Sequence, residues 1–299
     1  MKKLHKIKFS LVGKFLKNEI TEDRTYFALT ILTGLLAGIV TVSFEYLIHT
    51  ITDYIGTNKA FTPKAFLWGG VLIFISGWLT TRKFPTTGGS GVPGVKLALA
   101  VYHGNIPLKN TIAKYVTTVL SLSSGISLGK EGPVVTISSG IGSSLGRFFH
   151  LSKKRVKALV AVGSASGIAA AFNTTISAVV FTMEEVVGDL NTKAMGSIII
   201  SSVVAAVTGQ ILMGDRFLFD KLNYKLNDPK ELLFYLLIGV VAAVVRQLWM
   251  KTTLFLRKTC RHVLKSHRLS LIMISFLIVG GMSQIDPSVL GGGHSSLEM

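Results

Sequence analysis

The stretch that decides the fold is residues 158–183, which read ALVAVGSASGIAAAFNTTISAVVFTM and contain no charged side chain. A membrane-spanning helix needs roughly 20 mostly apolar residues. This stretch is longer, but Gly163, Gly167 and the polar residues 173–175 interrupt it. We therefore predict two helices that meet near Asn173.

Further apolar segments flank this stretch on both sides. Residues 194–214 and 269–285 carry no charge, and charged residues make up only 16% of the 299. A soluble domain carries about 25%. The mean hydropathy is +0.53. These features predict an all-α, polytopic transmembrane bundle, with further helical segments at 25–51, 65–81, 115–128 and 232–250.

The charge lies between the apolar blocks, and the net charge is +17. Because no aromatic and basic residues alternate, nucleic acid binding is not indicated. Basic loops at 153–157 and 251–268 are typical of the cytoplasmic face. The basic segment 1–24 is expected on that face too, at the membrane surface, with a membrane domain over 25–299. One cysteine excludes a disulfide within the chain, and we expect no metal and no cofactor.

Two apolar pieces are too short to cross a bilayer. Residues 92–102 and 132–146 would be about 16 and 22 Å long as helices. Glycines precede each of them. Broken helices in corresponding places are the best sequence pointer to an ion or substrate site in a transporter. The residues that open each piece are therefore candidates for such a site.

The first piece opens on residues 89–93, Gly-Ser-Gly-Val-Pro. Ser90 supplies a hydroxyl, and the two glycines let the backbone approach a ligand closely. Pro93 suits the first turn of a helix. A helix N-terminus with free N–H groups favours an anion. A plain turn without a ligand is the alternative.

The second piece opens on residues 129–133, Gly-Lys-Glu-Gly-Pro, which repeat this design and add two ionisable groups. Such groups at membrane depth are expensive and point to function. A carboxylate at a helix N-terminus competes with an anion for the same N–H groups. Glu131 would thus block when ionised and open when protonated. A Lys130–Glu131 pair in a surface loop is the alternative.

The order of these motifs, followed by GSASGIAAAFN at 163–173 and then Met183, Glu184 and Glu185, resembles the ClC family of chloride channels and proton-coupled antiporters. The resemblance runs from about residue 25 to the end. It implies a bundle with broken, re-entrant helices that forms the first inverted repeat and the start of the second. It also implies an anion site built from Gly89, Ser90, Gly91, Val92, Lys130, Glu131 and Gly132.

The resemblance further assigns proton-handling roles. Glu131 is the external gate, Glu185 the internal proton acceptor, and Glu184 a weaker candidate beside it. Serine at position 90 favours chloride over nitrate or fluoride. These features imply voltage- and pH-dependent Cl⁻/H⁺ exchange by a homodimer in the cell membrane, with the N-terminus in the cytoplasm. A passive chloride channel and a non-transporting membrane protein fragment are the alternatives.

The largest departures from the family pattern are absences. Neither the Gly-x-Phe-x-Pro helix start nor the late tyrosine at the inner mouth is found, so a fragment or a truncated chain is expected. An enzyme is not expected, because residues 125–130 are one residue short of a phosphate-binding loop. Glu45, near the outer end of the first span, is expected to reach the membrane interface.

Overall fold

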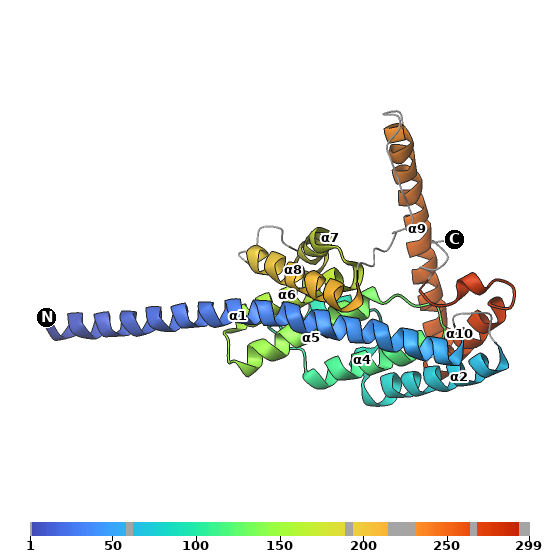
Figure 1. Ribbon diagram of the computed structural model, residues 1–299, viewed down its shortest axis with the longest axis horizontal. Coiled ribbons are helices and arrows are strands. Elements are labelled where there is room, and N and C mark those ends of the chain that lie inside the picture. Colours follow the sequence, from blue (N-terminus) through green and yellow to red (C-terminus); the bar gives the residue numbers. More distant parts are fainter. Residues whose placement is uncertain (1, 58–61, 189–193, 215–230, 264–267, 293–299) are drawn as a thin grey trace.

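The computed structural model describes residues 2–57, 62–188, 194–214, 231–263 and 268–292, and all regular elements within these ranges are helical. Most of them pack side by side into one bundle (Figure 1). The predicted all-α architecture is confirmed. A polar loop is expected between the predicted segments 194–214 and 232–250, and these residues, 215–231, lie outside the described part of the chain except for the last one.

Five of the described helices contain segments long and apolar enough to cross a membrane, namely Glu22–Ile55, Pro63–Lys83, Lys153–Phe172, Met195–Met213 and Phe234–Thr259. They belong to α1 (Lys2–Ile55), α2 (Pro63–Trp78) with the π-turn η1 (Leu79–Lys83), α6 (Lys153–Phe172), α8 (Met195–Met213) and α9 (Glu231–Val263). Each overlaps a segment predicted from the sequence. The boundary expected at residue 24 falls inside α1, which is continuous.

Shorter helices fill the space between the spans. They are α3 (Val92–Ala100), α4 (Leu108–Ser123), α5 (Glu131–Phe148), α7 (Thr175–Phe181) and α10 (Arg268–Met282), with the short turns η2 (Pro85–Thr87), η3 (Thr182–Val187) and η4 (Pro287–Val289). The two short pieces predicted to open on glycine motifs are therefore present as α3 and α5. The long uncharged block is broken as expected, because Asn173 adopts a left-handed conformation (φ 53°) and ends α6.

The core is the contact between α5 and α6. A Cβ atom at Gly163 would collide with the carbonyl oxygen of Ser138, and one at Gly142 with that of Leu159. The hydroxyls of Ser139 and Ser164 lie 2.6 Å apart between the two helices. Small residues thus let these backbones approach closely, as they do in membrane helix pairs.

Two predicted segments had wrong boundaries. The segment expected at 115–128 is α4, which begins at Leu108 directly after Pro107 and ends near Gly125, whose φ is 85°. The span expected to end at Met250 continues as α9 to Val263. Its basic residues are good helix formers and no glycine or proline interrupts them. In Figure 1, α9 projects away from the bundle, and none of its apolar span is buried.

Contacts between distant segments define the two ends of the bundle. At one end, Glu22 on α1 accepts a hydrogen bond from the backbone N–H of Ser152, which precedes α6. At the other end, the Thr57 hydroxyl donates to the carbonyl oxygen of Ser123, where α4 ends. We call the first of these the basic end, because it carries the basic loop 153–157. We call the second the opposite end.

Candidate functional site

The loop before α3 takes a shape that only glycine allows easily. Gly89 and Gly91 have φ values of 80° and 104°, in the left-handed region. A Cβ atom at Gly91 would also collide with the side chain of Thr136 on α5. Ser90 stands between them, and its residue is exposed at the loop tip. Pro93 lies in the first turn of α3, as predicted.

The loop before α3 rests directly on the N-terminus of α5. A Cβ atom at Gly132 would collide with the carbonyl oxygen of Ser90. The motifs at 89–93 and 129–133 are therefore in contact, although the sequence separates them. The first N–H groups of a helix have no partner within the helix. Two such N-termini, those of α3 and α5, meet here, and their dipoles both favour an anion.

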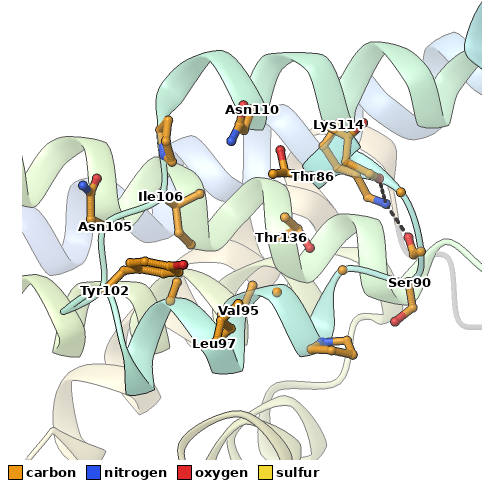
Figure 2. Close-up of a pocket in the computed structure, with 18 of the residues that line it drawn as sticks. Thr86, Ser90, Val95, Leu97, Tyr102, Asn105, Ile106, Asn110, Lys114 and Thr136 are labelled. Atoms are coloured by element: carbon orange, nitrogen blue, oxygen red, sulfur yellow. Dashed lines mark hydrogen bonds between the residues drawn. The ribbon is translucent and has the colours of Figure 1, made fainter. Parts of the chain in front are cut away.

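A buried lysine that the sequence analysis did not select supports this loop. The Lys114 ammonium on α4 donates to the carbonyl oxygens of Thr87 and Gly89, at 2.9 and 2.7 Å. Figure 2 shows its side chain reaching from α4 to the loop that carries Ser90. The residue is only 5% exposed. In the sequence, Lys114 could have been recognised as a lone cation within the stretch 110–128.

Two cavities meet at Lys114 and the loop that it contacts. The first, of about 640 Å³, is lined by Tyr102, Asn105 and Ile106, which lie near the basic end, and by Thr136 and Arg257. The second, of about 540 Å³, is lined by Ser121, Ile126 and Leu128, which lie near the opposite end, and by Glu131. Both share a set of lining residues, namely Thr87, Gly88, Gly89, Ser90 and Lys114. The proposed anion loop thus separates a cavity on one side from a cavity on the other.

Glu131 belongs to the second cavity alone. Its residue is exposed, and its carboxylate lies against Gly129, where a Cβ atom would collide with Oε2. Glu131 is the first residue of α5, so its carboxylate lies at the N-terminus of that helix and lines the second cavity. The gating role that the sequence predicts for Glu131 stays a prediction.

Two of the residues proposed for the anion site do not line either cavity. Val92 packs against the apolar cluster that contains Val95 and Val160. The Lys130 ammonium lies 2.7 Å from a carboxylate oxygen of Glu45 on α1. The expectation that Glu45 reaches the membrane interface was wrong, because its side chain is 9% exposed and paired. A buried partner 85 positions away in the chain is invisible to local patterns.

Glu184 and Glu185 lie in the π-helical turn η3, and both residues are exposed. Glu185 stands 3.7 Å from the ammonium of Lys96 on α3, the helix that the Ser90 loop opens. The proposed proton acceptor is thereby connected to the helix of the anion loop. Among the described residues, no group of His, Cys, Asp or Glu side chains could hold a metal ion.

The chain is similar in sequence to curated chloride transport proteins. Over 258 residues the chain is 30% identical to the H⁺/Cl⁻ exchange transporter ClcA of Vibrio cholerae, covering 79% of this chain and 54% of that protein. It is 30% identical over 205 residues to a putative ClcB-like chloride channel protein of Ralstonia nicotianae, covering 66% and 47%. The chain thus spans about half the length of these curated relatives.

Solved structures share the fold. A slow cyanobacterial Cl⁻/H⁺ antiporter matches with a TM-score of 0.79 at 23% identity, covering 91% of this chain and 67% of that one. A CLC-type fluoride/proton antiporter matches with a TM-score of 0.77 at 22% identity, covering 89% and 67%. The family model described as voltage gated chloride channel matches residues 69–299. This chain belongs to the voltage-gated chloride channel family.

Proposed function

We propose that the full-length protein exchanges chloride for protons across a membrane. The observation that carries the proposal is the contact between the Ser90 loop and the N-terminus of α5, at the point where two cavities meet. Chloride would bind there, held by the N-terminal N–H groups and the Ser90 hydroxyl. The names of the ClcA relatives, which are H⁺/Cl⁻ exchange transporters, support the same ion pair.

Glu131 would gate this site from the second cavity. Ionised, its carboxylate takes the place of an anion at the N-terminus of α5. Protonated, it loses that attraction and leaves the site to chloride. Because the basic loop 153–157 marks the opposite face as cytoplasmic, the second cavity would face outward and the N-terminus would lie inside the cell.

Glu185 would accept protons on the inner side. Its turn follows α7, and its carboxylate contacts α3 through Lys96. Proton transfer between Glu185 and Glu131 would couple proton movement to chloride movement in the other direction. Glu184, one position earlier and equally exposed, is the weaker candidate for the same task.

Family membership supports a proposal on assembly and location. We propose a homodimer in the cell membrane, in which each subunit has its own pore, no cofactor takes part, and the surrounding partner is the lipid bilayer. Cross-linking of the purified protein in vesicles, followed by mass measurement, tests the dimer. A single-subunit mass at every cross-linker concentration would contradict it.

Chloride efflux from proteoliposomes, recorded together with pH, tests the transport proposal. The wild type should take up protons as chloride leaves. Glu131→Gln and Glu185→Gln should each abolish proton uptake while chloride still moves. Glu184→Gln should keep the coupling, and loss of coupling there instead would move the proton acceptor to Glu184. Chloride flux without protons in the wild type would identify a passive channel, and no flux at all would contradict transport.

A further inference from the structure

The residue directly before the proposed gate is held by an ion pair with a distant helix. Lys130 precedes Glu131, and its ammonium lies 2.7 Å from Oε1 of Glu45, in the second half of α1. The side chains are 18% and 9% exposed. A buried pair of this kind is costly to break, because removal of one partner leaves the other charge unpaired.

A second contact holds the Lys130 side chain in the same orientation. Its ammonium lies over the ring of Phe172, 5.6 Å from the centroid, and Phe172 is the last residue of α6. The side chain therefore joins three elements: α1, the start of α5 and the end of α6. It lines neither cavity, whereas Lys114 lines both.

This arrangement separates two neighbouring charges of opposite sign. Without Glu45, the nearest carboxylate along the chain to Lys130 is that of Glu131. An ammonium that turned towards Glu131 would favour its ionised form and oppose its protonation. The ion pair with Glu45 holds the Lys130 ammonium against α1. The carboxylate of Glu131 then lines the second cavity without this ammonium as its partner.

We propose that Glu45 is a positioning residue for the gate: by holding Lys130 against α1, it keeps Glu131 free to take up a proton. The inference rests on the proposed chloride/proton exchange and adds a residue to it. The other ionisable groups near this network are Lys114, which lines the second cavity with Glu131, and His49, which is exposed and stands 3.9 Å from Glu45. Neither displaces Lys130, which is the closer partner of Glu45.

The test is the dependence of chloride efflux on external pH in proteoliposomes containing the full-length protein. Glu45→Gln keeps the size of the side chain and removes its charge. The external pH at half-maximal flux should fall by about one unit, since an adjacent opposite charge shifts carboxyl protonation by 1–3 units. Lys130→Met added to Glu45→Gln should return the midpoint towards the wild-type value. Glu45→Asp, which keeps the charge, should shift it less than Glu45→Gln does.

A background without the titrating gate separates positioning from general damage. In Glu131→Gln, the further change Glu45→Gln should leave the pH profile where it was. A shift that persists in that background, or an unchanged midpoint in a well-folded Glu45→Gln, overturns the inference while the wild type still exchanges ions. No flux from the wild type overturns the proposed function and this inference together.

A second comparison serves if Glu45→Gln does not fold. Lys130→Met alone and Lys130→Met with Glu45→Gln should then share one midpoint, because Glu45 acts only through the ammonium of Lys130. Different midpoints in these two variants would show that Glu45 reaches the gate by another route and would overturn the proposal.

Discussion

The ammonium of Lys114 donates a hydrogen bond of 2.7 Å to the carbonyl oxygen of Gly89, the residue that precedes Ser90. A second bond, to the carbonyl oxygen of Thr87, fixes the same loop. The side chain thereby shapes the loop and also places a positive charge between two cavities. Both effects favour an anion at Ser90.

Removal of this charge should weaken chloride binding. In Lys114→Met, two carbonyl oxygens lose their donor and the cavities lose a cation. A unit charge at about 4 Å is worth about 1–4 kcal/mol at effective dielectric constants of 80 to 20, so we expect the chloride dissociation constant to rise at least about fivefold. Isothermal titration calorimetry of the purified protein with chloride measures it.

Lys109→Met is the matched control for Lys114→Met. Lys109 lies on the same helix but is exposed and lines neither cavity. The control should bind chloride as the wild type does. Equal affinities in the two variants would show that Lys114 has no influence on the anion.

The contact between Gly132 and Ser90 should tolerate no side chain. In Gly132→Ala the new methyl group meets the Ser90 carbonyl oxygen, which is backbone and cannot rotate away. The loop and the α5 N-terminus must then separate, and we expect chloride efflux to fall more than about tenfold, because small displacements of aligned groups carry large costs.

Gly196→Ala on α8 provides the comparison for Gly132→Ala, since a Cβ atom at Gly196 meets nothing within 4 Å. It should transport at the wild-type rate, and its helix should gain slightly from the better helix former. Full transport by Gly132→Ala would mean that the two motifs need not touch.

Local patterns predicted the broken helices well. Glycines, prolines and a left-handed Asn173 are signals that act within a few residues, so the starts of α3 and α5 and the break after α6 were confirmed. The two glycine motifs are in contact, and the anion site that the family resemblance implies there stays a prediction. The sequence alone could not predict that contact, because it depends on how α3 and α5 pack against each other.

Buried charges were the part that sequence reasoning could not place. Hydropathy treats Lys114 and Glu45 as residues that seek water, yet their partners are backbone oxygens and Lys130, far away in the chain. Only the packing of α1, α4 and α5 brings them together. The length of α9 was missed for a different reason. The basic residues after Met250 predicted a cytoplasmic loop, but charge alone does not distinguish a loop from a helix that continues beyond the membrane.

Stability should depend on the close approach of α5 and α6. Gly163→Ala introduces a methyl group at the carbonyl oxygen of Ser138, and such overpacking costs about 1–3 kcal/mol. The melting temperature of the detergent-solubilised protein should fall. Gly281→Ala, on α10 where a Cβ atom meets nothing within 4 Å, should not lower it. Similar melting temperatures for both variants would contradict the packing described for the core.

The ion pair between Lys96 and Glu185 should have only a small effect on proton coupling. Their side chains are 50% and 55% exposed and stand 3.7 Å apart, and exposed pairs of this kind contribute only about 0–1 kcal/mol. Lys96→Gln should therefore change the ratio of chloride to protons by less than about fivefold, whereas Glu185→Gln should abolish proton uptake. The two variants are compared in the same proteoliposome recording. If Lys96→Gln uncoupled transport as completely as Glu185→Gln, proton coupling would require the ammonium of Lys96 as well as the carboxylate of Glu185.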